Sequence, residues 1–187
     1  MRIVGGKHRG RPLQAPASKA TRPTTDRLRE SLFNMLAHAY GDAADGARVL
    51  DLFAGTGALG IEALSRGAVF ALFVEDAAEA RALIRANVDA LGLAGSTKIF
   101  RRDATALGEM GPGGPYDLVF CDPPYGKGLA EAALASARDG GWLAPNALLI
   151  IEEQTGAFTV PDGFEEIERR RYDDSELTFL QPVAAAP

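Results

Sequence analysis

The stretch ARVLDLFAGTGALG, residues 47–60, decides the fold. Its first half is an apolar run typical of a buried strand, and the glycines after it indicate a tight turn into a helix that ends near Gly67. A strand, a glycine turn and a helix in this order open a doubly wound α/β sheet that binds a nucleotide at the turn. The spacing Gly55-x-Gly57-x-x-Gly60 also matches the dinucleotide fingerprint, which is a weak signal by itself.

The apolar patterns on either side of this unit extend the sheet. Further strands are predicted over 69–74, 97–100, 116–121 and 147–151, and an edge hairpin over 164–171 and 176–180. Helices are predicted over 26–40, 77–91 and 129–137, the first of them capped by Thr24, Thr25 or Asp26. We therefore expect an α/β fold with a doubly wound, mostly parallel seven-stranded sheet and an antiparallel C-terminal edge hairpin.

Three side predictions accompany this pattern. Residues 139–146 are expected to form a turn region, in which Trp142 is a packing residue rather than a platform for a base. Asn87, near the end of the helix over 77–91, is expected to be a solvated helix residue.

Four of the predicted strands carry an acid at their carboxyl end: Asp51, Glu75, Asp103 and Asp122. Carboxyl ends of parallel strands meet at one edge of the sheet, where ligands bind, so we expect these acids to share a site. An acid at the tip of the second strand can accept both hydroxyls of a ribose. Asp51 could reach a cation on the same ligand.

Asp122-Pro123-Pro124-Tyr125 ends the strand over 116–121 abruptly, because neither proline can donate to the ladder. The turn leaves a carboxylate, a carbonyl and an aromatic ring at the sheet edge. A carboxylate and a carbonyl can together grip an amino group, and a tyrosine can stack on a flat ring. The pattern favours a site for a planar base that carries an amine.

The charge is unevenly distributed along the chain. Residues 1–29 hold eight Lys or Arg and one acid, a net charge of +7, whereas the remainder has a net charge of −12. A basic arm on an acidic body predicts a polyanion held at one end. Two short extended pieces around Gly5-Gly6 and Gly10 predict a small N-terminal β-hairpin. The candidate contacts to the polyanion are Arg2, Lys7, Arg9, Arg11 and Arg22.

Composition restricts the class further. With 187 residues, 47% apolar and 24% charged, the chain matches a globular protein with one core. A single cysteine, Cys121, excludes an internal disulfide, and with only His8 and His38 beside it we expect no metal site. There is neither an apolar run of the ~20 residues that a membrane span needs nor the apolar core of a signal peptide. We expect a cytoplasmic monomer.

Taken together, these motifs resemble those of class I S-adenosylmethionine-dependent methyltransferases. The Asp-Pro-Pro-Tyr box resembles the catalytic box of enzymes that methylate exocyclic or amide nitrogens. The blocks RIVGGKHRGR at 2–11 and RPTTDRLRE at 22–30 are similar to the start of the RsmD family, and the resemblance continues to about Leu180. It implies methylation of N2 of one guanine in bacterial 16S ribosomal RNA, free or in a small-subunit assembly particle.

The resemblance also implies roles for individual residues. Asp122 and the Pro123 carbonyl would hold the target amino group, with Tyr125 stacked on the base. Thr24 and Thr25 match a segment that closes over the methionine carboxylate. S-adenosyl-L-methionine, which leaves as S-adenosyl-L-homocysteine, would be bound by Thr24, Thr25, Asp51, Phe53, Ala54, Gly55, Gly57, Glu75, Asp103, Ala104 and Asp122. The implied organisation is an RNA-binding arm over 1–22, a methyltransferase domain over 23–182 and a disordered tail over 183–187.

Alternatives stay open at this point. A DNA or RNA adenine-N6 methyltransferase would use the same Asp-Pro-Pro-Tyr box. An NAD-dependent oxidoreductase would use the glycine fingerprint, although no Tyr-x-x-x-Lys pattern accompanies it. A non-enzymatic binder of ribosome-assembly intermediates would need only the basic arm.

Overall fold

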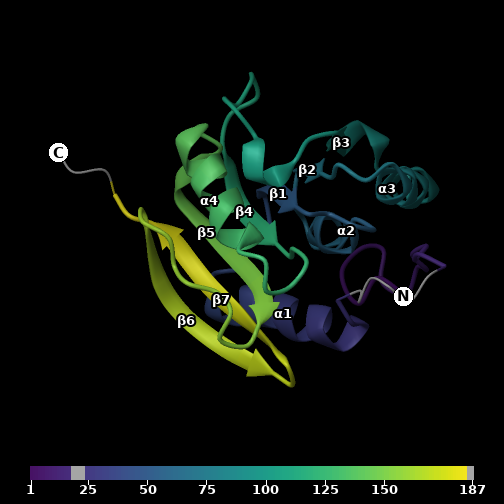
Figure 1. Ribbon diagram of the computed structural model, residues 1–187. Helices are drawn as coiled ribbons and strands as arrows, with labels where there is room; N and C mark the ends of the chain where they lie inside the picture. Colours follow the sequence, from purple (N-terminus) through teal and green to yellow (C-terminus); the bar gives the residue numbers. More distant parts are fainter. Residues whose placement is uncertain (18–23, 185–187) are drawn as a thin grey trace.

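The computed structural model describes residues 1–17 and 24–184, and this part of the chain forms a seven-stranded sheet in the order β3-β2-β1-β4-β5-β7-β6. The five strands from β3 to β5 pair in parallel, and β7 and β6 pair antiparallel at the far end (Figure 1). The mostly parallel sheet and the antiparallel edge hairpin are therefore confirmed. The strands are β1 Arg48–Leu52, β2 Phe70–Val74, β3 Thr97–Phe100, β4 Tyr116–Cys121, β5 Leu143–Gln154, β6 Phe164–Tyr172 and β7 Ser175–Pro182.

The described part of the chain has four α-helices and two short 3₁₀ helices, of which α1 precedes the first strand and the others lie between strands. They are α1 Asp26–Ala39, α2 Ala58–Ser65, α3 Ala78–Ala90, α4 Leu129–Asp139, η1 Ala94–Ser96 and η2 Ala104–Ala106. Thr25 caps α1, its side chain accepting a hydrogen bond from the Leu28 N–H at 3.1 Å. None of the helices in residues 1–17 and 24–184 is long and apolar enough to cross a membrane.

Two hydrophobic clusters cover the two faces of the sheet. Alternate residues of each strand point to opposite faces, so Phe120 of β4 packs with α1, α2 and α3, whereas Val119 packs with α4 and η2. Phe33 of α1 lies against Phe120 with ring centroids 5.6 Å apart. Trp142 is buried beside Tyr116 and donates from Nε1 to the Gly108 carbonyl at 2.8 Å, which confirms its packing role.

One predicted boundary is wrong. Residues 143–146 belong to β5, which begins at Leu143 and pairs with Tyr116 of β4 there, before a register shift. The sequence Ala144-Pro145-Asn146 favours a turn, because proline cannot donate to a ladder and asparagine favours bends. These residues are extended all the same, in the irregular stretch between the pairing of Leu143 with Tyr116 and that of Leu148 with Leu118.

The N-terminal hairpin, residues 1–16, packs onto the body of the protein. Its two arms meet at the antiparallel bridge between Arg2 and Pro12, and Ile3 and Leu13 are buried in the cluster on the α1 side of the sheet. The tip rests on the end of α2, where the Lys7 N–H donates to the Ser65 carbonyl at 2.7 Å. The predicted hairpin is confirmed, and its contacts with α2 and α3 give it the support that two short strands lack alone.

Candidate active site

Strand register brings two carboxylates together at the carboxyl edge of the sheet. Phe120 of β4 is paired with Ile150 of β5, and both side chains lie in the cluster on the α1 side. Asp122 and Glu152 each follow two positions later, so both point to that same face. The pairing of β4 with β5 therefore sets the two acids side by side.

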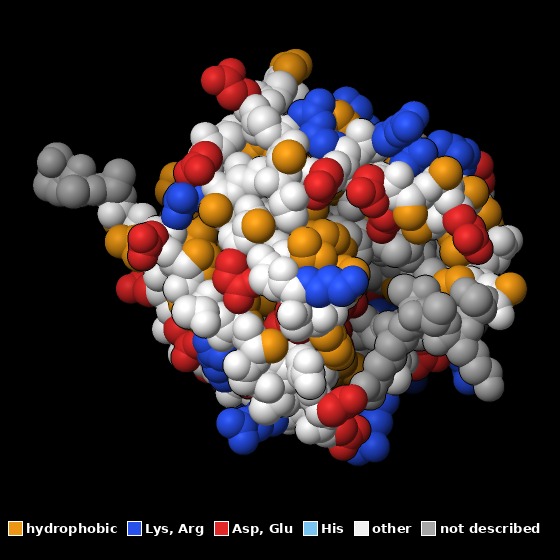
Figure 2. All heavy atoms as spheres, viewed as in Figure 1, with side chains coloured by type: hydrophobic (Ala, Val, Ile, Leu, Met, Phe, Trp, Pro, Cys, Tyr) orange, Lys and Arg blue, Asp and Glu red, His pale blue; other side chains and the backbone are white. Residues whose placement is uncertain are grey.

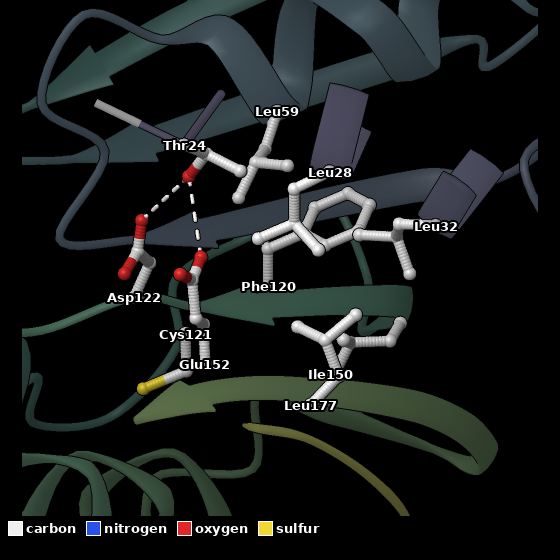
Figure 3. Close-up of a pocket in the computed structure, with 10 residues that line it drawn as sticks. All are labelled: Thr24, Leu28, Leu32, Leu59, Phe120, Cys121, Asp122, Ile150, Glu152 and Leu177. Atoms are coloured by element: carbon white, nitrogen blue, oxygen red, sulfur yellow. Dashed lines mark hydrogen bonds between the residues drawn. The ribbon is translucent and has the colours of Figure 1, made fainter. Parts of the chain in front are cut away.

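Thr24, just before α1, joins these two acids. Its hydroxyl Oγ1 lies 2.9 Å from Oδ2 of Asp122 and 3.3 Å from Oε2 of Glu152, as Figure 3 shows. Below the hydroxyl lies a small pocket with otherwise mainly apolar walls, among them Leu28, Phe120 and Leu177, between α1 and the sheet (Figure 3).

This environment favours the protonated form of Asp122. Burial, and then the neighbouring Glu152 carboxylate, raise the pKa of Asp122 well above its ordinary value, against the lowering effect of the Thr24 hydrogen bond. Asp51 and Glu153 add smaller effects in the same upward direction. Two carboxylates around one hydroxyl form the kind of pair in which like charges disfavour simultaneous ionisation.

The Asp-Pro-Pro-Tyr loop is anchored by the two consecutive acids at the end of β5. The Tyr125 hydroxyl donates to Oε1 of Glu152 at 2.7 Å, and the Gly126 N–H donates to Oε1 of Glu153 at 2.9 Å. Burial, followed by the charge of Glu152, raises the pKa of Tyr125. Pro123 is buried and Pro124 is exposed, so the loop projects from the sheet edge with its aromatic ring half-buried.

The glycine turn after β1 forms the neighbouring part of the edge. Phe53 adopts φ 57° and Gly55 φ 59°, both in the left-handed region. For a bulky residue such as Phe53 this backbone is strained, and strain of this kind collects where ligands bind. Glu75, just after β2, is joined to this turn, because its Oε2 accepts from the Gly55 N–H at 2.9 Å.

Asp51 lies deeper than the other acids. It is 1% exposed, and its Oδ2 accepts from the Gly60 N–H in the first turn of α2 at 3.0 Å. Burial raises the pKa of Asp51 to about 8, with Glu75 adding to the rise and the Gly60 bond opposing it. Gly60 is needed there, because a Cβ would lie 2.5 Å from the Phe73 ring.

Asp103, which follows β3 at the edge of the sheet, is the exposed member of the four predicted acids. It caps η2, accepting from both the N–H and the hydroxyl of Thr105 at 2.8 and 2.7 Å, and these bonds lower its pKa. Ala104 is buried beside it. Of the four acids predicted at strand ends, Glu75 follows β2, Asp103 follows β3 and Asp122 follows β4. Asp51 lies within β1, one residue before its end.

Asn87 was predicted wrongly as a solvated residue. It is 2% exposed, and its Oδ1 accepts from the Gln14 N–H at 2.7 Å. Its Nδ2 donates to the carbonyls of Gln14 at 3.2 Å and Thr56 at 3.0 Å. The N-terminal hairpin, α3 and the glycine turn are therefore held together by one amide, a long-range contact that helical periodicity does not reveal.

The structure also shows what the sequence reasoning missed. Glu152 was not among the predicted site residues, although it follows the predicted strand 147–151 just as Asp122 follows the strand 116–121. Once the strand 147–151 is placed next to 116–121, the acid after each strand falls at the same edge. Of the predicted polyanion contacts, Arg2, Lys7, Arg9 and Arg11 are exposed, and Arg22 lies outside the described residues.

The sheet order, with its last two strands reversed, and the site along its carboxyl edge define a class I S-adenosylmethionine-dependent methyltransferase. The model of the family described as "Conserved hypothetical protein 95" matches residues 1–181. The chain belongs to this family, the RsmD family of ribosomal RNA methyltransferases.

The relatives agree with this assignment. "Ribosomal RNA small subunit methyltransferase D" of Escherichia coli K12 is 45% identical over 165 residues, which cover 86% of this chain and 79% of the relative. "Ribosomal RNA small subunit methyltransferase D" of Haemophilus influenzae is 35% identical over 156 residues, covering 82% and 79%. The solved structure of YhhF from Escherichia coli has a TM-score of 0.83 at 36% identity and covers 99% of both chains.

Proposed function

We propose that this enzyme transfers a methyl group to the exocyclic N2 of a specific guanine in the 16S ribosomal RNA of the small subunit. The observation that carries the proposal is the position of the Asp122–Pro123 turn, one strand away from the glycine turn, at the edge where ligands of such sheets bind. A relative at 45% identity carries the small-subunit ribosomal RNA in its name.

The residues of the edge fit S-adenosylmethionine as the methyl donor. Each oxygen of Glu75 accepts one backbone N–H, from Gly55 and Ala77, which leaves lone pairs for ribose hydroxyls. When bound, the cofactor supplies an electrophilic methyl group on a sulfonium. Asp103 and Ala104 would bind its adenine, and Asp51, Phe53, Ala54, Gly55, Gly57, Thr24, Thr25 and Asp122 would surround its methionine end.

The chain's own task is to orient a poor nucleophile. The lone pair of the guanine amino group is delocalised into the ring. An Asp122 carboxylate oxygen and the Pro123 carbonyl would accept its two N–H groups and direct the lone pair outward. Orientation of this kind contributes up to about 7–11 kcal/mol. Tyr125, with its hydroxyl held by Glu152, would stack on an extruded base, a contact worth about 1–3 kcal/mol.

The RNA would lie along the basic surfaces beside this edge. Arg2, Lys7, Arg9 and Arg11 of the N-terminal hairpin are exposed, and Arg22 would extend the series. Figure 2 shows further Lys and Arg side chains over the edge that carries β3 and α3. The exposed basic residues there include Arg85 of α3, Lys98 of β3 and Arg101 just after β3. Phosphate contacts of this kind position RNA without reading its sequence.

We extend the proposal to organisation and setting. The arm over 1–22 serves RNA binding and 23–182 is the methyltransferase domain, whereas most of the predicted tail, residues 185–187, lies outside the described residues. The enzyme acts as a cytoplasmic monomer on a small-subunit assembly particle, because ribosomal proteins would supply the positive surface that its acidic body lacks.

The test is methyl transfer from labelled S-adenosylmethionine to protein-free 16S RNA and to assembly particles, with the product nucleoside identified by mass spectrometry. We expect N2-methylguanosine, and more of it on the particle. Asp122→Ala should keep cofactor binding in a calorimetric titration and lose transfer. Label in N6-methyladenosine, or transfer to naked DNA, would instead support the adenine alternative, and normal turnover of Asp122→Ala would remove the assigned role.

A further inference from the structure

We propose that Glu152 is a positioning residue for the transfer reaction, a carboxylate tied to Asp122 through the Thr24 hydroxyl that makes Asp122 a stronger proton acceptor while it fixes the Tyr125 ring. This inference rests on the proposed function of Asp122 and assigns a role to an acid that does not itself need to touch the base. It is carried by the two contacts of Thr24 and the contact of Tyr125.

The hydroxyl of Thr24 has one hydrogen and two carboxylate neighbours, at 2.9 and 3.3 Å. It can donate fully to one of them at a time. The hydroxyl nevertheless stays within contact distance of both acids and holds Asp122 and Glu152 close together. Two carboxylates at this separation raise each other's affinity for a proton.

The surroundings of Asp122 strengthen this effect. Within residues 1–17 and 24–184, the charged groups that raise its pKa are acids: Glu152 first, then Asp51 from β1 and Glu153 from β5. Together with burial they raise its pKa well above the ordinary value. Of these charges, Glu152 has the largest effect on the pKa of Asp122, because the pairing of Cys121 with Ile151 places the two acids side by side.

A stronger proton acceptor suits the chemistry of an amino group. Once the guanine nitrogen has gained a methyl group, it carries one proton too many. One N–H bond then breaks, its electron pair stays on nitrogen, and the proton forms an O–H bond with Asp122. The efficiency of such a transfer rises as the pKa of the acceptor approaches the working pH.

Glu152 also orients the loop. Its Oε1 accepts the Tyr125 hydroxyl at 2.7 Å while its Oε2 faces Thr24. One carboxylate thus links the residue that would stack on the base with the residue that would receive the proton. Glutamine at this position keeps the Oε1 acceptor and removes the charge, which separates the two roles.

The experiment compares the pH dependence of single-turnover transfer for the wild-type enzyme, Glu152→Gln and Thr24→Val. Glu165→Gln, an exposed acid on β6, is the matched control. Removing the Glu152 charge lowers the pKa of Asp122, so the acid limb of the profile should move to lower pH. The plateau should fall about tenfold to a hundredfold, since Asp122 becomes a weaker base.

At low pH the lower pKa of Asp122 raises the rate of Glu152→Gln, whereas its weaker basicity lowers that rate. The pH profiles of Glu152→Gln and the wild type should therefore converge there. A damaged fold would lower the whole profile and leave the limb in place. A limb that stays in place in Glu152→Gln, or moves to higher pH, would overturn the proposal whatever happens to the plateau. The limb of Glu165→Gln should coincide with that of the wild type.

A second measurement keeps this inference apart from the proposed function. The carboxyl carbon of Asp122 can be titrated by NMR in selectively labelled protein without RNA, in the wild type and in Glu152→Gln. A lower Asp122 pKa in the variant supports the coupling even if the RNA substrate is different, and an unchanged pKa refutes it. Failure of the wild type to methylate guanine N2 would refute only the proposed function.

Discussion

Replacing Asn87 with alanine removes the amide that joins the N-terminal hairpin, α3 and the glycine turn. The Gln14 N–H and the carbonyls of Gln14 and Thr56 then lose a partner. An unsatisfied group costs about 1–3 kcal/mol when buried, and less where the exposed rim of the hairpin admits water. We therefore expect the free energy of unfolding to fall by about 2–4 kcal/mol, which lowers Tm by about 4–16 °C in a chain of this size.

The assay is reversible urea unfolding followed by circular dichroism, with calorimetry for Tm. Asp89→Ala on the exposed face of the same helix is the control and should change the stability by less than about 0.5 kcal/mol. Asn87→Asp tests the polarity of the contact, because aspartate can still accept from Gln14 but cannot donate to Thr56. Hydrogen exchange should show lost protection at the Gln14 amide. An Asn87→Ala enzyme as stable as the control would refute the reasoning.

Three further predictions follow from other contacts. Gly60→Ala places a methyl 2.5 Å from the Phe73 ring, so it should destabilise the fold by about 1–3 kcal/mol in urea unfolding; a neutral result would show that Phe73 moves aside. Asp51 has a folded-state pKa of about 8 against an ordinary 3.8, so its protonated form stabilises the fold below pH 4, and this contribution is lost as the pH rises through 8. Asp51→Asn should therefore gain stability relative to the wild type as the pH increases. A difference in the free energy of unfolding that stays constant with pH would contradict this. Charge reversal at Arg9 and Arg11 should weaken RNA binding and flatten its dependence on salt, and an unchanged slope would show that the hairpin does not touch phosphate.

Much of the fold could be predicted, because in most elements the local preferences of the residues agree with the conformation that the tertiary structure requires. The glycine turn after β1 admits few alternatives, and the strands over 97–100 and 116–121 end where predicted because a polar or proline residue follows each. The start of β5 could not be predicted, since Ala144-Pro145-Asn146 carries turn chemistry and lies in a register shift, where β5 runs past β4 between the pairs Leu143–Tyr116 and Leu148–Leu118. An irregularity of this kind depends on the neighbouring strand and is not visible in local propensity.

The candidate site could be predicted in part for the same reason. Strand-end acids are visible as a local pattern, and Glu75 and Asp122 were found in this way. Asn87 was misread because its partners lie 73 and 31 residues away, in the hairpin and in the glycine turn. Glu152 also follows a predicted strand, but its contact with the group around Asp122 depends on β4 and β5 being neighbours, and that is a property of the sheet rather than of any window of sequence.

Asp122 and Glu152 are neighbours because the register of β4 and β5 pairs Cys121 with Ile151, the residues just before them. The connection between the two strands is anchored to β5 at Tyr125 and Gly126, and a change of length beyond Gly126 should leave the pair in place. A deletion of one residue inside β5 would instead turn Glu152 to the α4 face and aim Glu153 at Thr24, so the geometry would be remade around a different acid. Natural variation in chain length should therefore collect in the connection and avoid both strands, and engineered insertions belong there too.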